Sequence, residues 1–93
     1  MNAVSGTLRY WAAARDAAGV KEEAYQAATL AEALRAAVDR HGGPDGQLAR
    51  VLQRCAFVVD GEPASRRDPA TVRLTQGGTI EVLPPFAGGA GRR

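Results

Sequence analysis

Residues 29–44 read TLAEALRAAVDRHGGP and carry the clearest local signal in the sequence. Thr29 and Glu32 have the spacing of a capping box, in which the hydroxyl and the carboxylate each satisfy a free backbone donor at a helix start. Apolar residues then recur at the spacing of one helical face, and the Gly-Gly-Pro sequence ends the pattern. We therefore expect one amphipathic helix packed on a neighbouring layer. Its apolar face would consist of Leu30, Leu34, Ala37, Val38 and His41.

The segment before this helix predicts two strands. Residues 3–11 alternate apolar and polar side chains, which is the period of a strand with one buried face. Residues 12–18 are rich in alanine and are followed by Gly19, which indicates a short helical turn with a glycine stop. A second strand is expected over residues 20–26, and the short connection favours antiparallel pairing with the first.

The segment after the helix predicts a helical turn over 48–52, a strand over 55–59 and a last strand over 80–83. Turn sequences stand at 60–63 and 76–79. The order strand, strand, helix, strands is an α+β layout, with one main helix packed on a mixed sheet. For a chain of 93 residues this order indicates the β-grasp, or ubiquitin-like, fold.

Composition excludes several classes of function. With 45% hydrophobic and 24% charged residues, the chain predicts a single domain whose thin core leaves little room for an enclosed active site. The net charge of +2 comes from Arg92 and Arg93, since the other ten cationic residues balance ten acids. We therefore expect no nucleic-acid partner. No apolar run is long enough to cross a membrane, and we expect a cytoplasmic protein with no membrane partner.

The side chains offer no catalytic or metal-binding set. His41 is the only histidine and Cys55 the only cysteine, so three or four ligands for a metal cannot be assembled from them. Cys55 precedes an apolar run and is expected to be a buried, inert thiol, while His41 is expected to pack at the end of the helix. The sequence thus predicts neither a metal nor a bound cofactor.

The end of the chain is the one segment where small residues indicate a reaction, which would take place on the backbone carboxylate. Pro84 and Pro85 end the last strand because neither can donate to a sheet ladder. We expect a β-grasp domain over 1–85 and a flexible tail over 86–93. Gly88 and Gly89 have no Cβ, so this pair can enter a narrow channel of a partner enzyme, where the carboxylate would be activated as an acyl-adenylate. A glycine-rich end without a role is the alternative.

Two large apolar residues fall on the polar faces of their strands. Trp11 follows Thr7 and Arg9 at a period of two, and Leu83 follows Thr79 and Glu81. The first and last strands of a β-grasp sheet are parallel neighbours. Trp11 and Leu83 would then form one exposed apolar patch beside the root of the tail, as a docking surface requires. In the alternative interpretation, Trp11 covers the sheet edge or the turn that follows it.

Three segments together carry a family resemblance: residues 9–16 with Gly19, residues 29–34, and residues 78–89, which read GTIEVLPPFAGG. They resemble the MoaD/ThiS-like sulfur-carrier family, which contains the small subunit of molybdopterin synthase and the thiamine-pathway sulfur carrier. The long opening segment and the Pro-Pro pair resemble the molybdopterin-synthase type more than the shorter thiamine type.

The resemblance implies a carrier protein rather than an enzyme. An E1-like enzyme would use ATP to adenylate the carboxylate of Gly89, and a sulfur donor protein would convert it to a thiocarboxylate. The large subunit of molybdopterin synthase would then take the tail. Family members usually end at the second glycine, so we expect a processing protease to remove residues 90–93. The implied partner contacts are Trp11, Leu83, Pro84, Pro85, Phe86 and Ala87.

Three other functions fit the same residues. The carrier could deliver sulfur for cysteine or thiamine biosynthesis, which changes the partner and not the chemistry of the tail. It could be a ubiquitin-like modifier joined through Gly89 to lysines of other proteins. It could also be an interaction domain whose tail does not react. The final sulfur acceptor and the oligomeric state are left open by the sequence.

Overall fold

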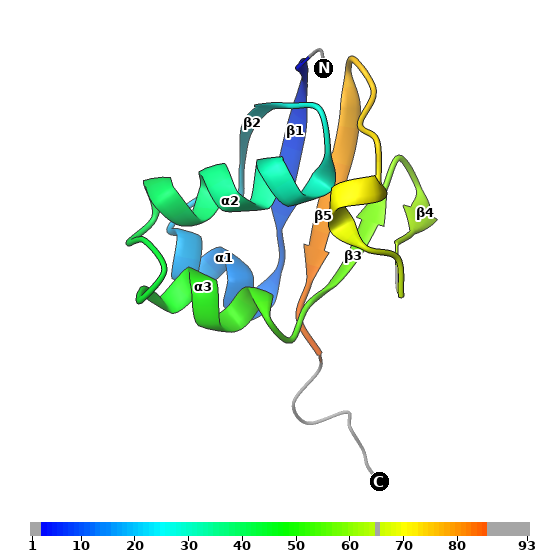
Figure 1. Cartoon of the computed structure of the whole chain (residues 1–93). Coiled ribbons are helices and arrows are strands. Elements are labelled where there is room, and N and C mark those ends of the chain that lie inside the picture. Colours follow the sequence, from blue (N-terminus) through cyan, green and yellow to red (C-terminus); the bar gives the residue numbers. More distant parts are fainter. Residues whose placement is uncertain (1–2, 65, 86–93) are drawn as a thin grey trace, which may run out of the picture.

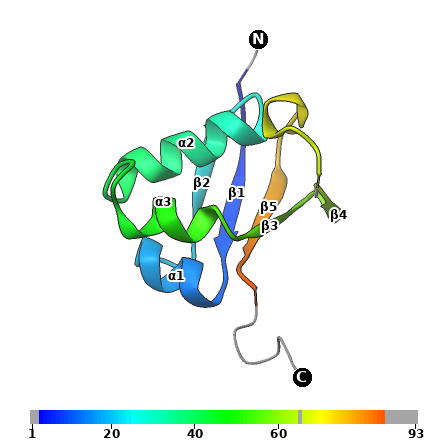
Figure 2. The ribbon, with the colours of Figure 1, turned by 60° about the horizontal axis from the view of Figure 1, so that its bottom comes forward.

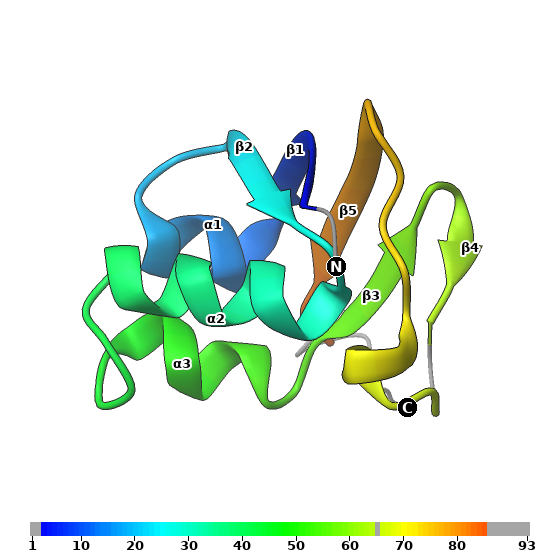
Figure 3. The ribbon, with the colours of Figure 1, turned by 45° about the horizontal axis from the view of Figure 1, so that its top comes forward.

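The computed structural model describes residues 3–64 and 66–85. Five strands form one sheet in the order β2-β1-β5-β3-β4 (Figure 1). Figure 3 shows α1, α2 and α3 together on one side of this sheet. The layout is the predicted α+β, β-grasp fold. The elements are β1 Val4–Tyr10, α1 Ala12–Ala18, β2 Glu22–Ala27, α2 Leu30–Arg40, α3 Gln47–Leu52, β3 Ala56–Val59, β4 Glu62–Pro63, the 3-10 helix η1 Pro69–Thr71, and β5 Gly78–Leu83.

The first and last strands lie side by side at the centre of the sheet (Figure 2). β1 pairs parallel with β5, in a register that places Gly6 opposite Gly78 and Tyr10 opposite Val82. β1 also pairs antiparallel with β2, and β3 pairs antiparallel with β5. The sheet is therefore mixed, as predicted, and β5 delivers the C-terminal segment at the same end of the sheet where β1 ends.

The core lies between the sheet and the helices. Leu8, Tyr10, Ile80 and Val82 point from β1 and β5 into this layer, and none of them is more than 2% exposed. Helices α2 and α3 supply the opposite side. No described helix covers the other face of the sheet, which we call the open face. The largest fully buried side chains are Leu8, Leu30, Leu48, Ile80 and Val82.

The start of α2 follows the capping box closely. Thr29 is the N-cap, and its hydroxyl oxygen accepts from the Glu32 N–H at 3.3 Å. The Glu32 carboxylate accepts from the Ala28 N–H at 2.9 Å. The buried face of α2 differs from the predicted one: Ala33 is buried in the core together with Leu30 and Ala37. The other members of the predicted face, Leu34, Val38 and His41, are only half-buried.

Several element boundaries differ from the predictions. The first strand ends at Tyr10, because the Trp11 carbonyl accepts from the Ala14 N–H at 3.0 Å and so starts α1. Gly19 stops α1 with a φ of 80°, as predicted. β2 begins at Glu22 rather than residue 20, and β5 begins at Gly78, two residues earlier than expected. The short strand β4 was not predicted.

Candidate functional site

Four of the predicted contact residues meet at one end of the sheet. The register that pairs Tyr10 with Val82 makes Trp11 and Leu83 the next residues on neighbouring strands. The Trp11 N–H donates to the Val82 carbonyl at 3.2 Å and continues the ladder. Trp11 is 41% exposed and Leu83 is half-buried. Pro84, buried, and Pro85, exposed, follow directly at the end of the described chain.

Polar neighbours hold the Trp11 ring on the open face. Its indole N–H donates to a Glu81 carboxylate oxygen at 3.1 Å. The Arg9 guanidinium carbon lies 5.3 Å from the ring centroid, in a cation–π contact, and Arg9 also pairs with Glu22 at 3.6 Å. The ring therefore has an ordered position before any partner binds, and this reduces the entropy lost on association.

Arg9 and Glu81 were not among the predicted site residues. Both alternate with Trp11 and Leu83 at a period of two, so strand parity alone placed them on the same face. The missing information was the register of β1 against β5, which brings Glu81 within reach of the indole. The Trp11 ring therefore lies over the open face of the sheet, where it contacts Arg9 and Glu81.

The backbone turns sharply just after Trp11. Ala12 has a φ of 49°, in the left-handed region, where a residue with a Cβ costs about 1–2 kcal/mol. This turn sends α1 under the sheet, where Ala14 and Ala18 are buried, while Trp11 stays at the sheet surface. The conformation thus separates the exposed Trp11 ring from the buried side chains of Ala14 and Ala18 within a few residues.

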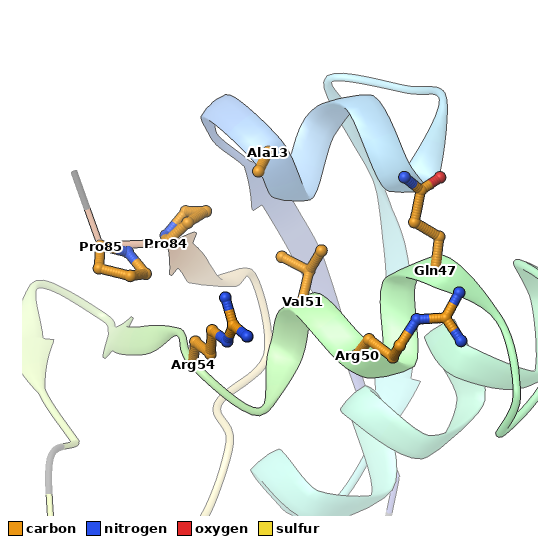
Figure 4. Close-up of a pocket in the computed structure, with 7 residues that line it drawn as sticks. All are labelled: Ala13, Gln47, Arg50, Val51, Arg54, Pro84 and Pro85. Carbon is orange, nitrogen blue, oxygen red and sulfur yellow. The ribbon is translucent and has the colours of Figure 1, made fainter. Parts of the chain in front are cut away.

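A groove opens beside the two prolines on the helical side of the same end (Figure 4). Its cavity measures about 480 Å³. Ala13 of α1 and Val51 of α3 form its apolar floor together with the prolines, and the Arg54 guanidinium extends toward Pro84 and Pro85. The lining residues are Ala13, Gln47, Arg50, Val51, Arg54, Pro84 and Pro85.

Cys55 and His41 have structural environments. The Cys55 thiol donates to the Val51 carbonyl at 3.3 Å, and partial burial raises its pKa to about 11, so it is a neutral thiol at pH 7. It is half-buried rather than buried. His41 caps the end of α2, with its Nε2 2.8 Å from a carboxylate oxygen of Glu23. The same oxygen accepts from the Tyr10 hydroxyl at 2.6 Å.

The described residues contain no group of three or more His, Cys, Asp and Glu side chains that could hold a metal. No helix in the described ranges has the length and apolar character to cross a membrane. The predicted site residues Phe86, Ala87, Gly88 and Gly89 lie outside the described residues. The described part of the candidate site is therefore the surface formed by Trp11, Leu83, Pro84 and Pro85, directly before residue 86.

Comparisons with known proteins bear on this surface and on the fold. The model of the ThiS family matches residues 8–89. Among curated proteins the sequence finds no match. The solution structure of small archaeal modifier protein 1 (SAMP1) from Methanosarcina acetivorans superposes with a TM-score of 0.79 at 17% identity, covering 96% of this chain and 100% of that chain.

Two molybdopterin-related structures are also similar. A putative molybdopterin converting factor subunit 1 from Pyrococcus furiosus has a TM-score of 0.66 at 21% identity, covering 89% of this chain and 99% of that chain. The subunit 1 and 2 complex of the Helicobacter pylori molybdopterin-converting factor gives a TM-score of 0.63 at 22% identity, covering 92% of this chain and 100% of the matched chain. At these identities the structures establish the shared fold.

Proposed function

The chain belongs to the ThiS family, and on that premise we propose that it is a sulfur carrier for molybdenum-cofactor biosynthesis whose chemistry takes place on the carboxylate of Gly89. The observation that carries this proposal is that the family match continues through the last strand and ends at Gly89. The structural likeness to two molybdopterin converting factor subunits supports the choice of pathway.

The proposed cycle uses the chain as a carrier and not as an enzyme. A partner E1-like enzyme binds ATP, joins the Gly89 carboxylate to AMP and releases pyrophosphate. The outer sulfur of a persulfide on a donor protein then attacks the acyl carbon and displaces AMP, and a second thiol cleaves the resulting acyl disulfide, which releases the thiocarboxylate and leaves a disulfide. The large subunit of a molybdopterin synthase takes up the tail and uses the sulfur. The carrier itself binds no cofactor, and the cycle runs in the cytosol.

The described residues contribute a docking surface with a defined exit for the tail. Trp11 and Leu83 present apolar surface on the open face, and Trp11 is held in place by Glu81 and Arg9. Pro84 is buried at the end of β5, so the departure point of the tail is fixed relative to Trp11. A partner that binds this surface thereby also locates the tail. We propose Phe86 and Ala87 as further contacts of the same partner.

Gly89 reacts only when its carboxylate is free. In the sequence Ala90, Gly91, Arg92 and Arg93 follow it, so we propose that a protease removes residues 90–93 before adenylation. Gly88 and Gly89 both lack a Cβ, which permits passage through a narrow channel.

The deciding experiment uses protein trimmed to Gly89, ATP and the E1-like enzyme of the same cell. We expect pyrophosphate release, followed with a sulfur donor by a mass gain that corresponds to sulfur in place of oxygen. A Gly89→Val variant of the trimmed protein is the matched control, and it should be adenylated poorly. A trimmed wild-type protein that releases no pyrophosphate would contradict the carrier function.

A ubiquitin-like modifier is the second candidate. The likeness to small archaeal modifier protein 1, which spans that whole chain, favours it. Both functions begin with adenylation, so the products separate them. Antibody detection on a denaturing gel of cell extract would show higher-mass conjugates for a modifier and free protein for a carrier. Sulfur delivery to cysteine or thiamine biosynthesis would instead leave synthesis of the molybdenum cofactor unaffected when the gene is deleted.

A further inference from the structure

The groove beside Pro84 and Pro85 combines apolar surface with two arginines. Arg50 lies on α3 and Arg54 follows the helix, four residues later in the sequence. Between them Val51 points toward Ala13 across the groove (Figure 4). We call the surface formed by Ala13, Gln47, Arg50, Val51, Arg54, Pro84 and Pro85 the arginine groove.

The arginines of this groove have no carboxylate partner among the described residues. The ion pairs among the described residues lie elsewhere: Arg9 pairs with Glu22, and Arg40 and His41 pair with Glu23. Both acids belong to β2. Arg50 donates to the backbone carbonyl of Asp45 at 3.2 Å. Residues 47–54 contain no acidic side chain. Two positive charges therefore flank an apolar floor, and neither forms an ion pair with a described carboxylate, Asp45 included.

We propose that the arginine groove binds an acidic segment of the E1-like enzyme that adenylates Gly89. Carboxylates of that segment pair with Arg50 and Arg54, since guanidinium groups bind carboxylates through two parallel hydrogen bonds. An apolar side chain between them rests on Val51 and Ala13. The proposal rests on the proposed function and adds a recognition site on the helical side of the domain, away from Trp11.

The position of the groove favours the enzyme that encloses Gly89. Gly89 lies four positions after Pro85, and an extended chain spans at most about 3.6 Å per residue, or ~14 Å. An enzyme surrounding Gly89 is therefore close to the groove. In the untrimmed chain the tail is a poor occupant, because the only charged side chains in residues 86–93 are Arg92 and Arg93, which the groove arginines repel.

The test compares carrier variants trimmed to Gly89 in pyrophosphate exchange with the E1-like enzyme. The double variant Arg50→Glu with Arg54→Glu should raise the KM for the carrier about tenfold or more and leave kcat unchanged, because the groove contributes to binding and not to the reacting atoms. Salt should raise the KM of the wild type by screening the attraction, and it should not raise that of the double variant, whose glutamates repel the acidic segment. Arg50→Lys with Arg54→Lys keeps the charge and should lie between the two.

Arg73→Glu is the matched control. Arg73 is exposed and lies opposite Thr29 at the start of α2, outside the groove. Arg73→Glu makes the same Arg-to-Glu change at one position outside the groove, and it should leave the KM near the wild-type value. Thermal unfolding of each variant checks that the fold is intact. If the wild type supports pyrophosphate exchange and the Arg50 and Arg54 double variant has the same KM, the proposed role of the arginine groove is wrong. The carrier function would not be affected by that result.

A second measurement does not depend on adenylation. A synthetic peptide of alternating glutamate and leucine is titrated into ¹⁵N-labelled protein, beside a control peptide with glutamine in place of glutamate. We expect the acidic peptide alone to shift the amide signals of Ala13 and Val51, and the Arg50 and Arg54 double variant to lose the shifts. Equal shifts with both peptides, or shifts confined to other surfaces, would refute the proposal. Groove binding without pyrophosphate release from the wild type would refute the carrier function instead.

Discussion

The two faces of the sheet formed by β1 and β5 differ in burial and in charge. On the covered face Leu8, Ile80 and Val82 are completely buried. On the open face, the residues one position away are charged, as Arg9 and Glu81 are, or half-buried, as Leu83 is, and Trp11 is 41% exposed. Because successive side chains of a strand point to opposite faces, the same two strands serve both purposes. Stability should therefore depend on one set of alternate residues and partner binding on the other.

The largest loss of stability should follow a cavity on the covered face. Ile80→Ala removes a fully buried side chain, and such changes cost about 2–5 kcal/mol of the free energy of unfolding. Urea denaturation at neutral pH measures the loss. Thr7→Ala, on the open face of the neighbouring strand, is the comparison and should cost less than about 1 kcal/mol. Equal losses would mean that the open face is also packed in solution.

Gly6→Ala should give the next largest effect, because β1 has no room for a Cβ at this position. The added carbon would overlap the ring and hydroxyl of Tyr25 and lie 2.5 Å from the carbonyl oxygen of Gly78. Tyr25 would have to give up its hydrogen bond to the Thr75 carbonyl, which measures 3.1 Å. We expect a loss of about 1–3 kcal/mol by the same measurement.

A double-mutant cycle sharpens this second prediction. Tyr25→Leu replaces the aromatic ring and its hydroxyl with a smaller side chain, so Gly6→Ala should cost less in that background than in the wild type. Some cost should persist, since the Gly78 carbonyl is unchanged. Identical costs in the two backgrounds would show that Tyr25 does not limit the space at Gly6.

The sequence alone was sufficient for features set by local patterns. The cap at Thr29 and Glu32 and the glycine stop at Gly19 are local, and strand parity correctly put Trp11 on the exposed face. The arginine groove was not predictable in the same way, because α3, α1 and the end of β5 meet only in the folded chain. The Trp11–Glu81 hydrogen bond likewise spans 70 positions.

Glu23 tests a polar contact at the edge of the covered face. One of its carboxylate oxygens accepts from Tyr10, His41 and Arg40, at 2.6, 2.8 and 3.3 Å. Glu23→Gln keeps the shape and removes the charge, and it should cost about 1–2 kcal/mol at pH 7. Glu22→Gln, which alters the exposed pair with Arg9, is the control and should change stability by less than about 0.5 kcal/mol.

The pH dependence gives this third prediction a sign. Partial burial acts to raise the pKa of Glu23, but hydrogen bonds from Tyr10, His41 and Arg40 outweigh it and lower the pKa below its ordinary value of 4.5. The charged carboxylate therefore stabilises the fold above that value, and this stability is lost as the pH falls through the folded pKa. The deficit of Glu23→Gln should shrink as the pH falls below 4.5 and through the lowered pKa of the folded protein. A constant deficit over that range would assign it to shape rather than charge.

Trp11→Ala should have the smallest effect on stability and still the clearest effect on a partner. The ring is held by one hydrogen bond and one cation–π contact at an exposed site, and the lower ends of their usual ranges together predict a loss of about 1 kcal/mol. As an interface anchor it should cost about 2 kcal/mol of binding to the adenylating enzyme, or roughly thirty-fold in affinity. Val20→Ala is the matched control, because Val20 is 39% exposed and lies outside the sheet. If both variants bind equally well, the open face is not the docking surface. If Trp11→Ala instead destabilises the protein as much as Ile80→Ala, the open face also contributes to stability. The separation of the two faces into a stabilising face and a binding face would then be wrong.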